Sequence, residues 1–352
     1  MAFGFMKPNG IPLAVDFGVS RLKVLQLGGS GDAATTTVQA AAMREVPEVL
    51  WDKPPERLEW QARALGEILR GGNFKGKRVM CAMPSVHTTT QHVQVPADAG
   101  KSTLDPVAEE LRTLTGRDPS TLITRQYKVC EVSRSGAKRT ETICFAMGRD
   151  AVLAHMRALK SCKLEPVGIH AEHIALVRAL ERMQAKDAPT TGATLIVDLG
   201  RASTKVAVFA GRDIALARTI GVGERHMSAV APQPAPPPSA DRGGVALAEA
   251  PPAPAACAEL TLLSDEISQS VRYYQALFPD RKIDRLVFVG GGSTNTEVCR
   301  TIARVVRVPA QVADPIAALA KAPGFVADGL DTSAPMPGWA VAVGVSLLPT
   351  DL

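Results

Sequence analysis

Two stretches of the chain share one pattern of hydrophobic and polar positions. In each, an apolar run ends on Asp, Gly follows two positions later, and a Lys then leads into a second apolar run. The first copy contains Asp16 and Lys23, and the second contains Asp198 and Lys205. The pattern predicts a buried strand, a tight turn and a second strand, which form a β-hairpin with a carboxylate at its mouth.

The two copies align without a gap. Val197, Asp198, Gly200, Lys205 and Val206 fall on Val15, Asp16, Gly18, Lys23 and Val24. Either copy alone could be an ordinary hairpin whose turn contains Asp and Gly, but the repeat at long spacing favours two related lobes. Glycine allows close backbone approach, turn N–H groups form an anion-binding nest, and the carboxylate can hold hydrated Mg²⁺ beside the anion.

Apolar periodicity elsewhere predicts alternating strands and helices. Helices are expected at residues 58–69, 103–115, 150–164, 172–183, 260–278 and 297–306, and further strands at 38–43, 78–83, 88–95, 127–132, 142–147, 167–170 and 285–289. We interpret residues 1–87 and 165–192 as a first lobe, 88–164 as an inserted α+β subdomain, and 193–352 as a second lobe. Residues 231–258 are rich in Pro and Ala and are predicted to form a disordered loop.

Composition narrows the class of protein. Hydrophobic residues make up 46% of the 352 positions, which is enough for two sizeable cores. The net charge is +5, the basic residues are interspersed with acidic ones, and aromatic residues make up 4% of the chain. A nucleic-acid partner is therefore disfavoured, because it would need a clustered basic face with stacking aromatic residues. The six cysteines show no ligand spacing and no signal peptide is found, which predicts a cytoplasmic protein with reduced thiols. The apolar run 339–348 is too short to span a bilayer.

A glycine-rich turn follows the strand predicted at 285–289. Gly290, Gly291 and Gly292 lie between this strand and a helix, where glycine suits close approach of a nucleotide. The turn does not have the GxGxxG pattern, and no acidic residue follows at the sequence spacing from which it would hydrogen-bond a ribose hydroxyl. A Rossmann NAD site is therefore disfavoured. The alternative is a strand-to-helix turn that uses glycine only for tight packing.

The order of these motifs resembles the actin/Hsp70/sugar-kinase superfamily. Within it, the chain is most similar to the PilM family of type IV pilus assembly, with the cell-division protein FtsA as a more distant relative. The stretches that carry the resemblance are PLAVDFGVSRLKVLQL, VMCAMPSVHTTTQHVQVP, VGIHAEHIALVRAL, TLIVDLGRASTKVAVF, LLSDEISQSVRYYQALFPDRKIDRLVFVGGGS and WAVAVGVSLL. The resemblance implies an α/β, actin-like (ribonuclease H-like) two-lobed fold with an α+β subdomain inserted in the first lobe.

The resemblance also implies a site for ATP and Mg²⁺. Its first phosphate motif falls on Asp16, Gly18, Ser20 and Lys23, and its second on Asp198, Gly200 and Thr204. Asp16 and Asp198 are the implied metal residues, and Glu172 and Asp198 the catalytic ones, with Glu172 orienting the metal or the attacking water. Gly290, Gly291 and Gly292 would lie against the adenosine, and Glu266 would reach the ribose hydroxyls.

Structural alternatives stand beside these roles. Lys23 could be a solvated strand lysine, Glu172 could start a helix favourably near its dipole, and Ser20 and Thr204 could be turn formers. The chain also departs from the family pattern, because His170 stands where the connecting strand commonly carries an Asp. Hydrolysis of ATP is therefore expected to be weak or absent.

The resemblance implies an ATP-binding cytoplasmic scaffold of a type IV pilus or related secretion platform, peripheral to the inner membrane. It would bind the short cytoplasmic N-terminal peptide of a PilN-like membrane protein and contact other platform proteins. The resemblance does not decide whether the chain also associates with itself. One alternative is a small-molecule kinase of the same superfamily, which needs a positioned base. Another is an FtsA-like membrane-associated filament protein, although the last residues, GVSLLPTDL, contain no basic amphipathic helix.

Overall fold

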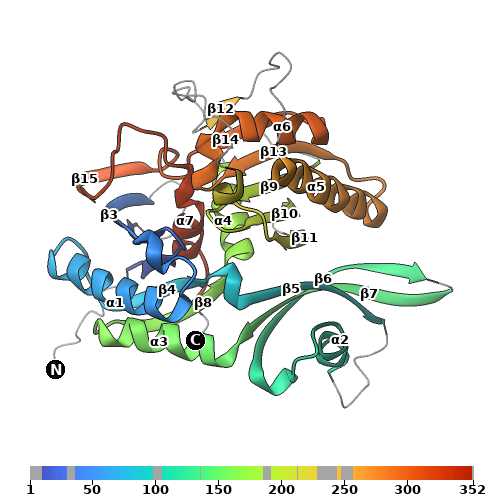
Figure 1. Cartoon of the computed structure of the whole chain (residues 1–352), viewed down its shortest axis with the longest axis horizontal. Coiled ribbons are helices and arrows are strands. Elements are labelled where there is room, and N and C mark those ends of the chain that lie inside the picture. Colours follow the sequence, from blue (N-terminus) through green and yellow to red (C-terminus); the bar gives the residue numbers. More distant parts are fainter. Residues whose placement is uncertain are drawn as a thin grey trace, which may run out of the picture.

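The computed structural model arranges two six-stranded sheets on either side of a central pair of helices (Figure 1). It describes residues 10–29, 36–97, 105–134, 136–184, 192–211, 213–227, 244–246 and 257–350. A separate three-stranded sheet extends to one side. This arrangement gives two lobes and an additional subdomain.

The first sheet is built around the N-terminal hairpin. Its strand order is β15-β3-β2-β1-β4-β8. The bounds are β1 Leu13–Phe17, β2 Arg21–Gly28, β3 Thr37–Glu45, β4 Arg78–Met83, β8 Glu165–Ala171 and β15 Ala320–Asp328. Apolar side chains of β1 alternate between the two faces of the sheet, and the outer face packs on α1 (Pro54–Arg70) and α3 (Arg149–Ser161).

The second sheet repeats this arrangement around the second hairpin. Its order is β11-β10-β9-β13-β14-β12. The bounds are β9 Ala193–Leu199, β10 Thr204–Ala210, β11 Asp213–Ile220, β12 Gly244–Ala246, β13 Ile283–Val289 and β14 Ala310–Ala313. Its outer face is covered by α5 (Ala258–Leu277) and α6 (Thr296–Val306).

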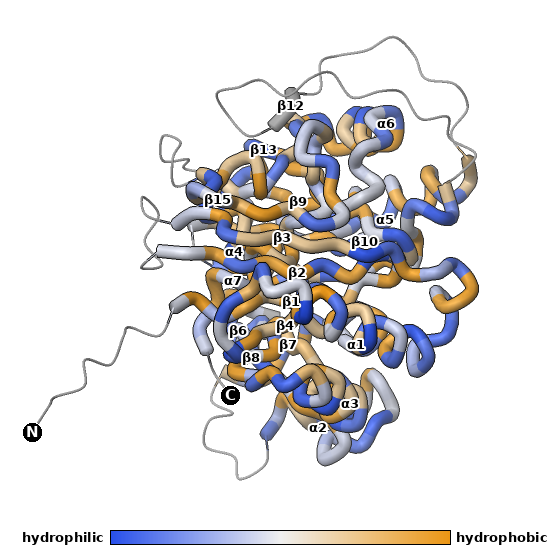
Figure 2. Tube along the Cα trace, turned by 90° about the vertical axis from the view of Figure 1, so that its left-hand side faces the viewer, coloured by the Kyte–Doolittle hydropathy of each residue, from blue (hydrophilic) through white to orange (hydrophobic). Residues whose placement is uncertain are grey.

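Helices α4 (Glu172–Gln184) and α7 (Ala340–Ser346) fill the space between the two sheets. One apolar cluster joins them to strands of both sheets, and the strands at the centre are coloured largely as hydrophobic in Figure 2. A Cβ on Gly344 would lie 1.8 Å from the carbonyl oxygen of Ala175, so only glycine lets α7 approach α4 this closely. The two lobes therefore share a continuous core.

The inserted subdomain consists of one helix packed on a three-stranded antiparallel sheet. The order is β5-β7-β6, with β5 Thr88–Pro96, β6 Leu122–Arg134, β7 Ala137–Gly148 and α2 Pro106–Thr115. Asp105 caps α2 by accepting the Val107 N–H. Short 3₁₀ helices occur at η1 Glu48–Leu50, η2 Ser85–His87, η4 Pro119–Thr121, η5 Glu224–Met227, η6 Gly291–Thr294 and η7 Pro337–Trp339.

The sequence pattern predicts most of the helices and strands, but it does not predict strands β14 and β15 or helix α7. Although β15 and α7 fall within the second lobe as drawn from sequence (193–352), β15 pairs with β3 and α7 packs on β1, β2 and β4 of the first sheet. Helix α3, placed by sequence in the insertion (88–164), packs on α1 and β8 of the first lobe as well as on β7.

The predicted disordered loop at 231–258 lies mostly outside the described residues. Within it, Gly244–Ala246 forms β12, which pairs antiparallel with β14 where a loop was expected. Among the residues that the structure describes, no helix is long and apolar enough to span a membrane.

Candidate functional site

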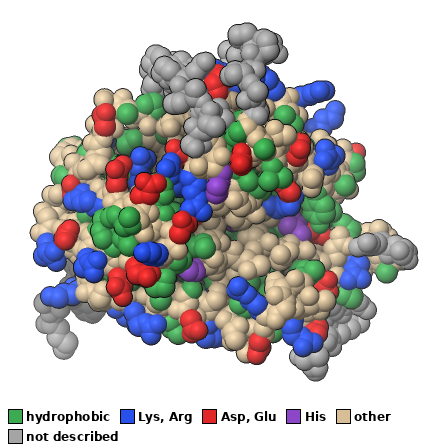
Figure 3. Space-filling view, viewed as in Figure 1, with side chains coloured by type: hydrophobic (Ala, Val, Ile, Leu, Met, Phe, Trp, Pro, Cys, Tyr) green, Lys and Arg blue, Asp and Glu red, His purple; other side chains and the backbone are tan. Residues whose placement is uncertain are grey.

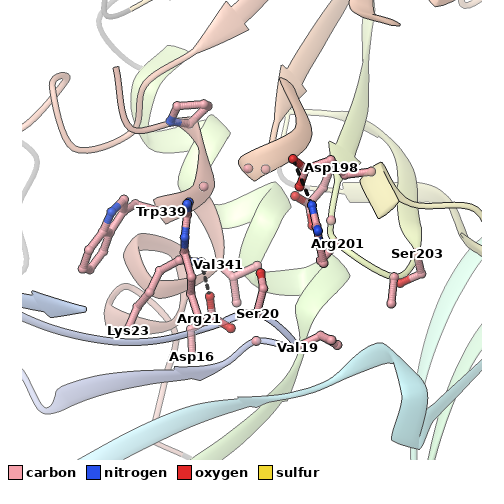
Figure 4. A pocket seen from close by; sticks show the side chains of 18 of the residues that line it. Asp16, Val19, Ser20, Arg21, Lys23, Asp198, Arg201, Ser203, Trp339 and Val341 are labelled. Carbon is pink, nitrogen blue, oxygen red and sulfur yellow. Dashed lines mark hydrogen bonds and ion pairs between the residues drawn. The ribbon is translucent and has the colours of Figure 1, made fainter. Parts of the chain in front are cut away.

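A cavity of about 860 Å³ separates the two hairpins and is lined from both lobes (Figure 4). Its walls include the turn between β1 and β2, the turn between β9 and β10, the start of α4, and the glycine turn after β13. Charged side chains of both signs line the cavity, among them Arg21, Lys23, Asp16 and Asp198. Lys and Arg are also interspersed with Asp and Glu on the face of the molecule drawn in Figure 3. The cavity is thus a mixed-charge cleft between two related lobes.

Each hairpin places an aspartate opposite a lysine. Asp16 pairs with Lys23 across β1 and β2, and Asp198 with Lys205 across β9 and β10. Directly opposed residues project from the same face of a sheet, and in both hairpins the lysine Nζ lies 2.8 Å from the aspartate Oδ2. All four side chains are largely buried, so each ammonium neutralises its carboxylate in a poorly solvated place.

The two turns are also built alike. A Cβ on Gly18 would lie 2.7 Å from the carbonyl oxygen of Arg21, and one on Gly200 equally 2.7 Å from that of Ser203. Each turn therefore requires glycine two residues after its aspartate. Gln61 on α1 donates to the carbonyl of Gly18 at 2.7 Å and fixes the first turn from behind.

Glu172 joins the two lobes at the bottom of the cleft. It is the first residue of α4, and its Oε2 accepts the Ser85 N–H at 2.9 Å and lies 3.5 Å from Lys205 Nζ. Burial raises the pKa of Glu172, with Lys205 opposing this rise. Burial also acts to lower the pKa of Lys205, but the attraction of Asp198 and Glu172 outweighs it and raises that pKa. Lys205 therefore stays charged beside two carboxyl groups.

The glycine turn closes one wall of the cavity. Gly290 has φ +90°, and a Cβ there would lie 2.3 Å from Asp198 Oδ1, so the position requires glycine. Its N–H donates to the Pro337 carbonyl, and Gly338 lies over Gly291, so the segment before α7 holds the turn in place. Arg21 approaches the same turn from the first lobe.

Contacts between the lobes also cross the mouth of the cavity. The Arg201 guanidinium lies over the Trp51 ring, 4.4 Å from its centroid. Next to it, Arg225 on η5 forms an ion pair with Asp52 at 2.6 Å. The hydroxyls of Ser85 and Ser203 meet at 3.0 Å deeper in the cleft. These pairs connect the first lobe to the second around the cavity.

The structure brings most of the predicted site residues to this one cavity. Those that line it are Asp16, Gly18, Ser20, Lys23, Glu172, Asp198, Gly200, Gly290 and Gly291. The other three predicted residues, Thr204, Glu266 and Gly292, do not line it. The Thr204 hydroxyl is fully buried and donates to the Val222 carbonyl at 2.7 Å. Glu266 pairs with Arg218 at 3.0 Å, and Gly292 packs against Leu199 beneath the turn.

Sequence reasoning missed several residues of the cavity. Lys205 had a signal, since it aligns with Lys23 in the repeat, yet no role was assigned to it. No sequence signal marks four other residues of the cavity, because only the folded chain brings them together. They are Trp51, Ser85, Arg201 and Ser203.

The residues predicted to hold Mg²⁺ do not present an open ligand set. Asp16 and Asp198 each have a lysine ammonium on Oδ2, and Oδ1 of Asp198 packs on the Gly290 backbone. Among the described residues, no group of three or more His, Cys, Asp or Glu side chains could hold a metal ion. The predicted metal role of Asp16 and Asp198 therefore does not fit this arrangement.

No protein-family model and no curated protein sequence matches the chain. Among solved structures, a PilM–PilN type IV pilus biogenesis complex matches with a TM-score of 0.68 at 18% identity, covering 97% of this chain and 98% of the other. A Bacteroides thetaiotaomicron protein with an actin-like ATPase fold matches at 0.44 (10% identity, 93% and 94% covered). The cytoplasmic domain of EpsL, an inner membrane component of the type II secretion system of Vibrio cholerae, matches at 0.43 (11% identity, 95% and 94% covered).

The last two TM-scores, below 0.5, are too low to support a conclusion about this chain. The likeness to the PilM–PilN structure, at 18% identity, shows the fold alone. The chain has the mixed α/β actin-like fold that its sequence predicted, and the resemblance to PilM is confirmed at the level of that fold.

Proposed function

We propose that this chain is an ATP-binding scaffold of a type IV pilus or related secretion platform, which docks a short peptide of a membrane protein. The observation that carries the nucleotide part is the pair of Asp–Lys hairpins that face one cavity from two lobes. The cavity volume of about 860 Å³ lies within the range of small-molecule sites.

The chemistry of the cavity suits a phosphate chain. Lys23 and Lys205 supply ammonium N–H donors, the two glycine turns supply backbone N–H groups, and Ser20 supplies a hydroxyl at the cavity wall. Gly290 and Gly291 offer a flat backbone surface for a base or ribose. ATP fits these features better than a smaller anion because the site has both a charged end and an uncharged wall.

The same geometry argues for weak or absent hydrolysis. A general base must be free to take a proton from water or an acceptor hydroxyl. Glu172 is instead buried, accepts the Ser85 N–H and lies 3.5 Å from Lys205. We therefore favour a scaffold whose shape responds to bound nucleotide over a small-molecule kinase.

The partner part of the proposal rests on the junction between the first lobe and the inserted subdomain. His87 on η2 contacts His155 on α3 with 5.6 Å between the ring centroids, which places η2 beside α3. From these elements Val86 is 59% exposed and Leu153 is 44% exposed. Val86 lies on η2, which directly precedes the edge strand β5, and Leu153 lies on the adjacent α3, so exposed apolar side chains at this junction suit an extended apolar peptide.

The solved PilM structure is a complex with PilN, which supports a peptide of a PilN-like inner-membrane protein as the partner here. The chain would then lie in the cytoplasm and reach the inner membrane through that partner. An isolated peptide buries little area, so we expect micromolar affinity, roughly −8 kcal/mol, with avidity at the membrane adding strength.

Calorimetry with ATP tests the nucleotide part. We expect Gly291→Leu, which adds bulk inside the cavity, to weaken ATP binding at least about tenfold. Gly148→Leu is the control, because a Cβ there meets nothing within 4 Å and lies outside the cavity, while one on Gly291 would meet only Arg21 at 3.8 Å. Equal ATP affinity in Gly291→Leu and the parent would reject the nucleotide site.

Pull-down with the cytoplasmic N-terminal peptide of the membrane protein encoded nearby tests the partner part. Leu153→Glu should reduce capture about tenfold, because a charge would replace an apolar contact. Val86 is left unchanged, because it also lines the cavity proposed for ATP. Val305→Glu on α6 is the control, since Val305 is 43% exposed on the other lobe. Undiminished capture by Leu153→Glu would place the partner elsewhere.

A further inference from the structure

The position expected for a divalent cation is taken by a side chain of the protein itself. Lys205 Nζ lies 2.8 Å from Asp198 Oδ2 and 3.5 Å from Glu172 Oε2. The resemblance assigned Asp198 to Mg²⁺, and gave Glu172 the role of orienting the metal or the attacking water. An ammonium in this place competes with a metal ion for the same two oxygens, and the two cations repel one another.

The surroundings keep Lys205 in this place. The residue is 7% exposed, so leaving the carboxylates would strand its charge away from water. The other oxygen of Asp198, Oδ1, lies in the space that a Cβ on Gly290 would fill, 2.3 Å from that Cβ position. Glu172 is held from the first lobe by the Ser85 N–H at 2.9 Å. The carboxylates and the ammonium therefore form a pre-organised group.

The first hairpin repeats the arrangement with Lys23 and Asp16. Both aspartates that could ligate a metal are thus neutralised by a lysine on the opposite strand. Two lysines set against Asp16, Asp198 and Glu172 leave little surplus negative charge to attract a divalent ion. Because the same Asp–Lys pair occurs in each lobe, the arrangement is a repeated structural feature of the cleft rather than one chance contact.

We propose that the Lys205 ammonium serves as a built-in substitute for the divalent cation, so that this cleft binds phosphate groups without requiring Mg²⁺. This inference rests on the proposed nucleotide site, and it assigns Lys205 as the residue that sets its metal requirement. In place of metal-bridged oxygens, phosphate oxygens would accept directly from Lys205 and Lys23. Removing the Lys205 charge should uncover Asp198 and Glu172 and create a metal site that the parent lacks.

The first experiment needs no nucleotide. Electron paramagnetic resonance measures free Mn²⁺ in the presence of the full chain, with Mn²⁺ alone as the probe. We expect no binding by the parent or by Lys205→Arg, which keeps the charge. Lys205→Gln should bind Mn²⁺ at least about tenfold more tightly than the parent. Lys321→Gln, on the exposed part of β15, controls for loss of one positive charge.

The second experiment compares ATP affinity in EDTA and in excess Mg²⁺. The parent should differ by less than about threefold, whereas Lys205→Gln should bind ATP at least about tenfold better with Mg²⁺. Thermal melting with and without Mn²⁺ follows folding, and Mn²⁺ should raise the melting temperature of Lys205→Gln only. If Lys205→Gln is unfolded without metal, recovery of its melting transition by Mn²⁺ is the expected result.

Tight Mn²⁺ binding by the parent would overturn the inference, as would a Lys205→Gln variant that neither binds nor is stabilised by Mn²⁺. A parent that needs Mg²⁺ to bind ATP would overturn it as well. Absence of ATP binding under every condition would reject the proposed nucleotide function instead, and the Mn²⁺ experiment would still decide the role of Lys205.

Discussion

Lys205 stands directly opposite Asp198 on neighbouring strands, with 2.8 Å between Nζ and Oδ2. Lys23 and Asp16 repeat this relationship at the same 2.8 Å in the other lobe. The sequence repeat is therefore a repeat of buried ion pairs. Burying such a pair costs desolvation free energy, which the attraction between the two charges offsets only while both are present. Substituting either partner should therefore destabilise the cleft.

Gly290→Ala should destabilise the protein by about 2 kcal/mol or more, because φ +90° disfavours a side chain and the Cβ would collide with Asp198 Oδ1 at 2.3 Å. ATP affinity should fall with it, since Asp198 must shift. Urea unfolding and calorimetry measure the two effects. Gly221→Ala is the control, because it also lines the cavity but its Cβ meets nothing within 4 Å. Equal stability of the two variants would contradict the role of Gly290.

Glu172→Gln should change how stability depends on pH. Burial raises the native pKa of Glu172 above its ordinary 4.5, so the folded state holds this proton more tightly than the unfolded state. That contribution to stability is present below pH 4.5 and is lost as pH rises through the native pKa. The variant has no such loss. Relative to the parent, its free energy of unfolding should therefore increase above pH 4.5, by up to about 1.4 kcal/mol per pH unit.

Urea unfolding from pH 4 to pH 8 measures this difference, with Glu59→Gln on the exposed face of α1 as the control for charge. A difference between Glu172→Gln and the parent that stays flat with pH would contradict the raised pKa.

Glu141→Ala should loosen the inserted subdomain from the second lobe. Glu141 is fully buried, and its Oε1 accepts from Tyr273 on α5 at 2.6 Å and from His92 Nδ1 at 2.8 Å. His92 Nε2 in turn accepts the Ala217 N–H on β11, so Nδ1 carries the proton. Removing the shared acceptor takes away the hydrogen-bond partner of both His92 and Tyr273 and should cost on the order of 3 kcal/mol in urea unfolding.

The control for this prediction is Glu131→Ala, whose ion pair with Lys128 is exposed on β6. Burial acts to raise the Glu141 pKa, but hydrogen bonds from His92 and Tyr273 outweigh it and lower that pKa. The Glu141 contribution should therefore be full above pH 4.5 and be lost as pH falls through the lower native pKa. If the stability difference between the parent and Glu141→Ala were instead lost as pH rises, the lowered pKa of Glu141 would be contradicted.

Trp51→Ala should speed release of nucleotide. The Arg201 guanidinium lies 4.4 Å from the Trp51 ring centroid across the cavity mouth, and this contact is lost when the lobes part. A cation–π contact of about 0.5–1 kcal/mol corresponds to a two- to fivefold faster dissociation rate. Stopped-flow release of a fluorescent ATP analogue measures the rate. Trp60→Ala on α1, outside the cavity, serves as the control, and an unchanged rate in Trp51→Ala would exclude a closing role.

The sequence by itself determined the two hairpins, because their register is local. A strand, a short turn and a second strand of apolar residues put Asp16 opposite Lys23, and Asp198 opposite Lys205, without help from the rest of the chain. Apolar periodicity likewise predicted helices such as α1 and α5, and the order of motifs predicted the actin-like fold. These features depend on residues close together along the chain.

Only the tertiary structure decided which side chains meet across the cleft. Lys205 reaches Glu172 on α4, and Ser85 meets Ser203, because α4 and α7 pack the two sheets against one core. The pairing of β15 with β3, far apart along the chain, was likewise decided only by the tertiary structure. Contacts between distant segments follow from the burial of whole faces, which no local pattern of residues encodes.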